Sequence, residues 1–292
     1  MSSGLVCSIC DKHTFQCTCD TSWNYFDNKI NECSGRTVND TQYTSLNVNT
    51  MTICFNFNQF IDLRKLYDGL PASLVMKYNP GTKKSKIKKK KGSDSFYNSL
   101  DIKITIKDHS KGVYSNVSIF FFPNGKGKLA GIKTINTISS AIDETLELIK
   151  YVSGTTESPE TLGIENVKIQ MICTDFKIKP VKTDLDGWCI KQEDLKNILV
   201  KEGYSATFNT LSRYPGINMK VNSIIEESKQ ISLFIFRSGS IIITGAKNAD
   251  DLVNCYKIIT AIIAKNNKQL FYYDINEEIK QKKKNKKKSE SA

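Results

Sequence analysis

The sequence lacks the marks of a membrane protein, of an exported protein and of the common enzyme classes. None of its apolar runs approaches the roughly 18 residues of a membrane-spanning helix, and its start, MSSGLVCSIC, lacks the charged and apolar stretches of a signal peptide. It has only two histidines in 292 residues, no phosphate-binding glycine motif and no nucleophile elbow. We therefore expect a soluble, non-enzymatic protein made in the cytosol, with 39% hydrophobic residues to form its core.

The net charge of +12 does not belong to the body of the chain. Fourteen of the 42 lysines and arginines lie in two runs, KKSKIKKKK at 83–91 and KQKKKNKKKSESA at 280–292, and the remaining 28 nearly balance the acidic residues. Like charges repel and do not pack, so both runs are expected to be solvated. They could contact phosphates, serve as a nuclear address, or only keep the protein in solution.

Cysteines gather near the N-terminus. Four of the nine cysteines have the spacing C-x2-C-x6-C-x-C, at Cys7, Cys10, Cys17 and Cys19. Structural zinc sites favour cysteine pairs two to four residues apart, which the first pair fits and the second does not. The segment 1–42 is therefore either a zinc site or a flexible tail whose cysteines stay reduced.

Two blocks of sequence recur in the same order. FRSGSIIITGAK (236–247) matches FPNGKGKLAGIK (122–133): both have Phe, two residues, Gly, and then a strand that ends in Gly-x-Lys. YPGINMKV (214–221) matches YNSLDIKI (97–104) in the same way. The recurrence is typical of two copies of one unit that differ by loop insertions.

A third block lies upstream of these two. MICTDF (171–176) matches TICFNF (52–57) at a separation of 119 residues. This match puts Cys54 and Cys173 at equivalent strand positions, where we interpret both as core residues.

Each copy is predicted to contain a strand, a short helix, further strands and a final helix. The short helices are predicted at 61–70 and 192–203, and Ser238 with Gly239 supplies a hairpin turn. Asn248 is the predicted N-cap of the last helix, whose acidic first turn suits the helix dipole. These elements predict an α+β fold, an antiparallel sheet with helices on one face. The other face is then open, and an open face that carries aromatic side chains indicates a binding surface.

The hairpin block resembles a known family. FRSGSIIITGAK resembles the signature F-x-S-G-K-hydrophobic-x-x-T-G-A-K of the TATA-box-binding proteins (TBPs), and YPGINMK resembles their F-P-G-hydrophobic-I-Y-R. The similarity covers roughly residues 45–270 and is stronger in the second copy. It implies two pseudo-symmetric repeats that form a saddle, with a curved antiparallel sheet whose concave face is open and with helices on the convex face. Members of this family enter the minor groove, insert apolar wedges between base pairs and kink DNA by about 80°.

The resemblance divides the chain into four parts. They are a Cys-rich segment at 1–42, a first repeat at 43–154 with a Lys-rich loop insertion at 81–95, a second repeat at 155–272, and a disordered Lys-rich tail at 273–292. Such a fold requires no cofactor.

The resemblance also implies which residues insert into DNA. Phe122 and Phe236 match the wedge that ends the third strand of each repeat. The partner wedge, phenylalanine in the family, matches Tyr97 and Tyr214, although Phe96 lies beside the first of these. An aromatic ring suits this role because it can replace the stacking that is lost when a base step opens.

Polar positions of the family are matched as well. The groove threonine, the basic residue of the second strand and the lysines of the Gly-Lys and Gly-x-Lys positions fall on Thr244, Lys103, Lys220, Lys126, Lys133 and Lys247. Such lysines neutralise phosphates and give salt-dependent affinity that carries no sequence information.

Several family positions are changed. The central asparagines fall on Thr50 and Ile169, Ala130 replaces the groove threonine of the first repeat, and Ser240 replaces the Gly-Lys lysine of the second. Because readout in the minor groove is already coarse, these changes are expected to relax the sequence preference.

We therefore interpret the chain as a TBP-like transcription initiation factor that binds and bends double-stranded, AT-rich promoter DNA. Its implied partners are proteins like transcription factors IIB and IIA and an RNA polymerase; no membrane is involved. The alternative is a TBP-fold scaffold that binds proteins in transcription and has weak or no sequence-specific DNA binding. The composition and the divergence suit a protist or a large DNA virus, so the setting would be a nucleus, or a cytoplasmic viral factory or virion.

Overall fold

The structure, a computed structural model, describes residues 21–80, 96–108, 112–152, 154–181, 187–211 and 215–289. The chain forms two compact units. Unit 1 contains residues 50–171 together with 21–24, and unit 2 contains residues 25–49 and 172–289. Two of the three boundaries between the units fall inside long strands and the third falls inside a helix, so none lies at residues 154 and 155, where the sequence repeat divides. Within the described ranges, no helix has both the length and the apolar character that crossing a membrane requires.

Unit 1 is an antiparallel sheet with two helices. Its strands pair in the order β3-β7-β6-β5-β4. Their bounds are β3 (Asn47–Phe57), β4 (Val75–Asn79), β5 (Ser99–Asp108), β6 (Val113–Phe121) and β7 (Lys126–Ile132). The helices are α2 (Leu63–Gly69), which Asp62 caps by accepting from two backbone N–H groups, and α3 (Asn136–Tyr151). A short 3-10 helix, Pro159–Thr161, precedes β8 (Ile164–Pro180).

Unit 2 has the same arrangement with additions at its ends. Its strands pair antiparallel in the order β10-β11-β12-β13-β8. Their bounds are β10 (Ser205–Phe208), β11 (Gly216–Asn222), β12 (Gln230–Phe236) and β13 (Ser240–Ala246), and the helices are α4 (Gln192–Lys201) and α5 (Ala249–Leu270). The additions are α1 (Thr21–Asn31), β1 (Arg36–Val38), β2 (Thr41–Tyr43), the pair β9 (Trp188–Ile190) and β14 (Phe271–Tyr273), and α6 (Ile275–Ser289).

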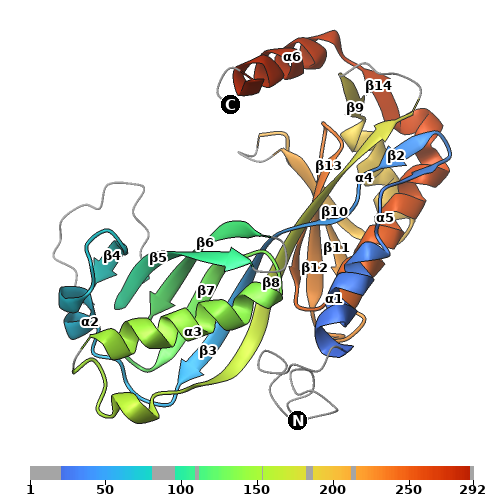
Figure 1. The fold of residues 1–292 in the computed structure, drawn as a ribbon. Coiled ribbons are helices and arrows are strands. Elements are labelled where there is room, and N and C mark those ends of the chain that lie inside the picture. The colour runs from blue at the N-terminus through green and yellow to red at the C-terminus, as the bar shows by residue number, and fades with distance from the viewer. Residues whose placement is uncertain are drawn as a thin grey trace. The chain divides into compact units, whose positions relative to one another are not determined.

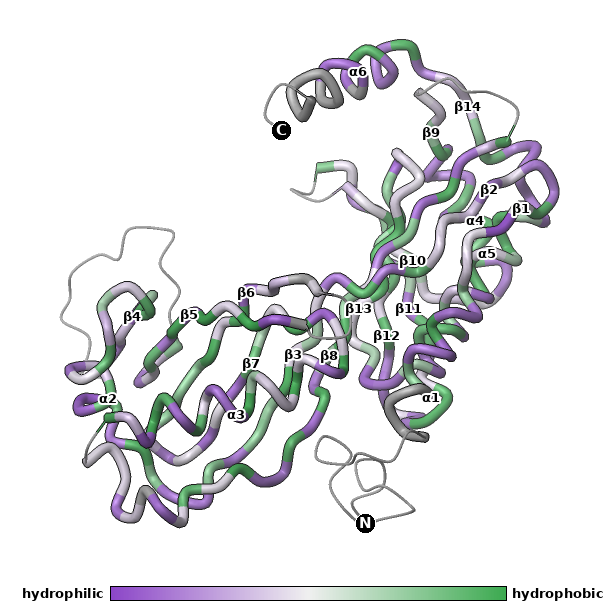
Figure 2. The backbone as a smooth tube through the Cα atoms, in the orientation of Figure 1, coloured by the Kyte–Doolittle hydropathy of each residue, from purple (hydrophilic) through white to green (hydrophobic). Residues whose placement is uncertain are grey.

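One face of each sheet is buried beneath a long helix. Alternate strand residues such as Ile119 and Leu129 in unit 1, and Leu233 and Ile243 in unit 2, have no exposed surface. Figure 1 shows α3 along one face of the sheet of unit 1 and α5 along one face of the sheet of unit 2. In Figure 2 hydrophobic and hydrophilic residues alternate along both helices, as burial of a single stripe requires. The expected α+β fold, an antiparallel sheet with helices on one face, is confirmed.

The hairpins repeat from unit to unit in detail. Gly125 and Gly239 have φ of 76° and 78°, and their N–H groups donate to the carbonyl oxygens of Phe122 and Phe236 at 3.1 and 3.0 Å. Further along each hairpin, Gly131 and Gly245 have φ of 96° and 97° next to a shift in strand register. Positive φ favours glycine because it lacks a Cβ, so the repeated glycines mark one backbone shape that is built twice.

The backbone hydrogen bonds correct the alignment of the block MICTDF (171–176) with TICFNF (52–57). Phe57 and Ile178 donate their N–H groups to the equivalent carbonyl oxygens of Gly125 and Gly239, so equivalent residues of β3 and β8 are 121 positions apart and not 119. Cys54 therefore corresponds to Asp175 and not to Cys173. Both cysteines are half-buried on the face away from the helices, so their interpretation as core residues is wrong.

The C-terminal lysine run is not a disordered tail, because residues Ile275–Ser289 form the helix α6. The carbonyl oxygen of Asp274 accepts from the N–H groups of Glu277 and Glu278, which begins the helix. Two glutamates in the first turn and lysines after it suit the helix dipole, and lysine is a good helix former. At the other long helix of unit 2, Asn248 accepts from the N–H group of Asp251, which confirms the predicted N-cap.

We expect the two glycines of the second hairpin to differ in their tolerance of a side chain. Gly245→Ala should lower the free energy of unfolding by about 1–2 kcal/mol, the cost of positive φ, because the nearest atom to an added Cβ is 3.8 Å away. Gly239→Ala should lower it further because its Cβ would collide with the carbonyl oxygen of Ile178. Urea unfolding of the two variants tests this order, and equal losses would contradict it.

Candidate nucleic-acid interface

The open face of unit 1 is formed by strand residues that alternate with the core. Phe120 of β6 lies between Asp101 of β5 and Lys128 of β7 in the strand ladder, so these three side chains share a face. They are half-buried, whereas their chain neighbours Ile119 and Leu129 are fully buried on the opposite face beneath α3. The face that points away from the helix therefore carries an aromatic ring between two charged groups.

Three aromatic rings and a lysine form a cluster on this face. The ring of Phe96 lies edge-on to Phe120 and to Phe122, with ring centroids 5.4 and 5.9 Å apart. The ammonium group of Lys128 lies 5.0 Å from the centroid of Phe96 and 5.4 Å from that of Phe120. The structure therefore brings Phe96 to Phe122, while the neighbouring Tyr97 has 64% of its surface exposed.

The open face of unit 2 carries equivalent aromatic side chains. Phe236 ends β12, and its ring lies so close to Gly216 that a Cβ there would be 3.1 Å from a ring carbon. Phe234 is two residues earlier on the same face, between Asn218 of β11 and Ile242 of β13. Tyr214 lies outside the described residues.

The basic positions divide between exposed groups and groups with partners. Lys103, Lys126 and Lys133 of unit 1 are exposed. In unit 2, Lys220 donates to the hydroxyl of Ser232 at 2.6 Å, and Lys247 forms an ion pair with Glu226 at 3.1 Å. Thr244 lies opposite Ser232 in the strand ladder and so shares the face of Lys220. Surface contacts of this kind are weak, so they do not prevent these lysines from meeting phosphates.

Two acceptors on the open faces have no hydrogen bond among the described residues. They are the buried Oδ1 atoms of Asp101 and Asn218, which occupy equivalent positions because each lies opposite an equivalent phenylalanine. Burial raises the pKa of the Asp101 carboxyl above its ordinary value of 3.8, against the opposing charge of Lys77. An acceptor without a donor is a cost to the folded state.

Phe120 and Phe234 are not among the residues predicted from the sequence, although both lie on the open faces. A signal for both was present, because side chains two residues apart on a strand share a face. Each lies two residues before a proposed wedge, in FFF at 120–122 and FIF at 234–236. The aromatic surface is therefore larger than the matched signature indicates.

The described residues include no metal site. Nowhere in the described ranges do three His, Cys, Asp or Glu side chains come together in a way that could hold a metal ion. The proposed ligands Cys7, Cys10, Cys17 and Cys19 lie outside these ranges, as does the Lys-rich loop 81–95. Among the described cysteines, Cys33 and Cys255 are fully buried, and burial raises the pKa of their thiols to about 11 and about 12.

Comparison with known proteins agrees with this geometry. Residues 192–266 match the family described as transcription factor TFIID, or TATA-binding protein, TBP. A protein of Acanthamoeba polyphaga mimivirus described as TATA-box-binding protein-like is 28% identical over an alignment of 199 residues, and the match covers 63% of this chain and 52% of the relative. The chain is thus similar to the TBP family and divergent from it. It spans about half the length of that viral relative.

The similarity to TBP is uneven along the chain. The family match covers the second repeat only, from α4 to most of α5, where the signature residues are also best kept. Among solved structures, Methanococcus jannaschii TBP aligns with 75% of this chain and 98% of its own, with a TM-score of 0.47 and 15% identity. For unit 1, the likeness to TBP is supported by the viral match, which is longer than the second repeat, and by the hairpin geometry that the two units share.

The positions of the central TBP asparagines are used differently here. The hydroxyl of Thr50 accepts from the N–H group of Gly131 at 3.1 Å, which holds the irregular end of β7. The neighbouring Asn49 accepts from the side chain of Asn47 at 2.8 Å, and Asn47 also donates to Asp175 at 3.1 Å. Thr50 and Asn49 therefore already have hydrogen-bond partners within the protein.

We expect Asp101→Asn to stabilise the protein in a pH-dependent way. Since burial raises the pKa of Asp101, the folded state holds this proton more tightly than the unfolded state, and stability falls as the pH rises from 3.8 through the raised pKa. The asparagine variant avoids this loss. Its free energy of unfolding should exceed that of the unchanged protein at about pH 7, and the difference should shrink at about pH 4.

The matched control is Asp143→Asn, which changes an exposed carboxylate of α3. Urea unfolding at both pH values compares the three proteins. A stabilisation that is the same at both pH values, or that also occurs in the control, would contradict a burial effect at Asp101.

Proposed function

We propose that the protein acts in transcription initiation by binding duplex DNA in the minor groove with the open faces of its two units, and by bending it. One observation supports this most strongly. Phe236 ends β12 and Phe122 directly follows β6; both precede the same glycine turn and lie on the face opposite the helices. A sheet that needed only to be stable would place polar side chains there, so aromatic rings at both positions favour a binding role.

The rings suit insertion between base pairs. Partial unstacking of a base step costs a few kcal/mol, which a flat apolar side chain offsets by stacking on the exposed base. In unit 1, Phe96 and Phe122 present two adjacent rings, and Phe96 is 46% exposed. In unit 2, Phe236 has the equivalent place, and Tyr214 is the proposed second wedge.

The lysines suit the phosphates on either side of the groove. Lys103, Lys126 and Lys133 are exposed in unit 1, and Lys220 and Lys247 of unit 2 are half-buried beside Ser232 and Glu226. Each phosphate contact releases counterions, so the affinity should fall as salt rises. Because phosphate contacts carry no sequence information, these residues position the DNA and do not select it.

The preferred DNA is proposed to be AT-rich, with weaker selectivity for a TATA sequence than the family signature implies. TA steps, which AT-rich DNA can supply, unstack and kink easily. Thr244 is kept as a groove threonine, but its equivalent is Ala130, and Thr50 is engaged within unit 1. The acceptors of Asp101 and Asn218 also make the face more polar.

Partners and setting follow from the same proposal. Proteins like transcription factors IIB and IIA and an RNA polymerase would dock on the units, and the site of action would be a nucleus or a viral factory. The viral relative supports the second setting. The second candidate function is a protein-binding scaffold, which the carboxylate of Asp101 favours because a negative charge on this face opposes DNA phosphates.

Fluorescence energy transfer on end-labelled duplexes tests the proposal. The unchanged protein should shorten the end-to-end distance of a duplex with an AT-rich centre more than that of one with a GC-rich centre. Phe122→Ala and Phe236→Ala should each abolish most of the bend, because each removes a wedge. Binding without a bend, unaffected by either change, would favour the scaffold.

The matched control is Tyr151→Ala, which removes an aromatic side chain that is 76% exposed at the end of α3, on the helical side of unit 1. It should bind and bend DNA as the unchanged protein does. Urea unfolding should show that both phenylalanine variants remain folded, since these rings are only half-buried.

A further inference from the structure

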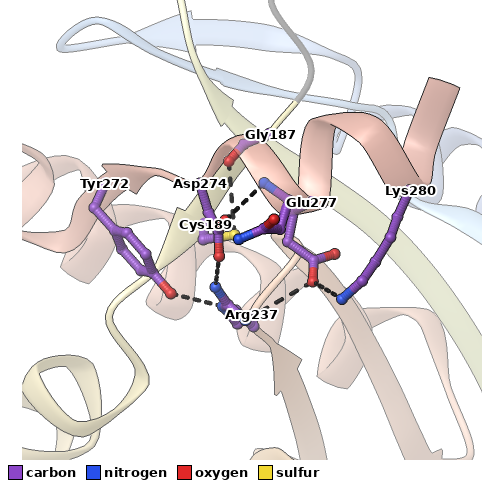
Figure 3. Close-up of polar contacts among 8 residues, drawn as sticks. Gly187, Cys189, Arg237, Tyr272, Asp274, Glu277 and Lys280 are labelled. Carbon is purple, nitrogen blue, oxygen red and sulfur yellow. Dashed lines mark hydrogen bonds and ion pairs between the residues drawn. The ribbon is translucent and has the colours of Figure 1, made fainter.

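Arg237, the residue after the proposed wedge Phe236, holds the start of the lysine-rich helix α6. Its Nε donates to the hydroxyl of Tyr272 at 2.6 Å, a terminal nitrogen donates to the carboxylate of Asp274, and another lies 3.8 Å from Glu277 (Figure 3). The acceptors come from β14, from the residue directly before α6, and from the first turn of α6. One side chain therefore joins the hairpin tip to the helix.

A second contact holds α6 from the other side. Gly187 has φ of 123°, and its carbonyl oxygen accepts from the N–H group of Asp274 at 2.9 Å (Figure 3). A Cβ on Gly187 would lie 2.9 Å from the Cβ of Glu278, so the backbone meets the helix there without room for a side chain. Glu278, only 8% exposed, also accepts from the hydroxyl of Tyr273.

These contacts turn the acidic groups of the first turn of α6 inward and leave the lysines with described side chains outside. Lys280 and Lys282 pair with Glu277 and Glu278 at 2.8 and 2.6 Å, yet 69% and 67% of their side chains are exposed. Lys283 is exposed as well. Ion pairs as exposed as these are weak, so a denser array of negative charge can replace them.

We propose that α6 is a second DNA-binding element, which grips the phosphates of the duplex next to the step that Phe236 opens. The inference rests on the proposed function, because Arg237 sets the position of the helix relative to that wedge. The residue equivalent to Arg237 in unit 1 is Pro123, whose side chain has no donor. This anchoring of a basic helix therefore belongs to unit 2, and it extends the contacted DNA on the side of Phe236.

Duplex DNA fits this helix better than a membrane does. Membrane-surface helices bury a broad apolar face, whereas the exposed apolar residues of α6 are only Ile275 and Ile279 within its described side chains. The hairpin that anchors the helix also carries the proposed wedge. A phosphate array beside the opened step is therefore the nearest polyanion.

The first test removes the charge. A variant with Lys280→Gln, Lys282→Gln and Lys283→Gln should bend AT-rich DNA as the unchanged protein does but protect a shorter stretch in hydroxyl-radical footprinting, with the loss at one end only. The slope of log affinity against log salt should fall in magnitude by about 0.9 for each phosphate that the variant no longer neutralises. The control variant changes three exposed lysines of α4 and α5, Lys201, Lys265 and Lys268, and should keep the full footprint.

The second test keeps the lysines and loosens the helix. Gly187→Ala should shorten the footprint as the triple variant does, because its Cβ would push against Glu278. The control is Gly203→Ala, which has a similar positive φ of 91° but no atom within 4 Å of an added Cβ. Arg237→Ala should behave like Gly187→Ala.

The outcomes separate this inference from the proposed function. If the unchanged protein neither binds nor bends DNA, both are wrong. If it bends DNA and the helix variants keep the footprint and the salt slope, only the role of α6 is wrong. If the lysine change lowers binding to anionic lipid vesicles or single-stranded RNA but not to the duplex, α6 serves another polyanion and the inference is overturned.

Discussion

Burial of one face of each sheet beneath a long helix is the constraint on which the other features depend. Because successive strand residues point to opposite faces, a strand with Leu233 and Ile235 under α5 must present Phe234 and Phe236 on the other side. The composition of the open face is therefore not needed for the core. The core therefore does not constrain which aromatic, basic and hydrogen-bonding side chains occupy the open face. The aromatic side chains nevertheless occur at equivalent positions in both units.

The hairpin turn fixes where the proposed wedges lie. A glycine at φ of 76° or 78° reverses the chain three residues after Phe122 and Phe236, and its carbonyl oxygen accepts from the first strand of the unit at Phe57 or Ile178. The turn is thus hydrogen-bonded through its glycine both to the neighbouring strand and to the residue that forms the proposed wedge. A ring that must enter a base step needs such a rigid support, since movement at the turn would weaken the stacking of the ring on the base.

The sequence predicted the repeat, the helices and the hairpins because their signals are local: glycine turns, an N-cap asparagine and periodic apolar residues. The sequence match aligned β3 of the first repeat with β8 of the second with an error of two residues. A strand pattern of period two is unchanged by a shift of two, so only the hydrogen bonds distinguish the two alignments. The sequence also did not predict α6, where the charge pattern alone indicated a solvated run. The helix depends on contacts from Arg237 and Gly187, which are distant in sequence.

The two units have the same backbone arrangement but different side chains on their open faces. This difference would allow a repeated fold to bind one piece of DNA in a single orientation. Lys128 lies over two phenylalanine rings in unit 1, and its equivalent in unit 2 is the apolar Ile242. Asp101 corresponds to the neutral Asn218. A protein with identical halves would bind a symmetric site equally well in both orientations. On the proposed DNA-binding function, differences in charge on equivalent positions would make the two orientations unequal in energy, because phosphates and base edges would meet different groups in each.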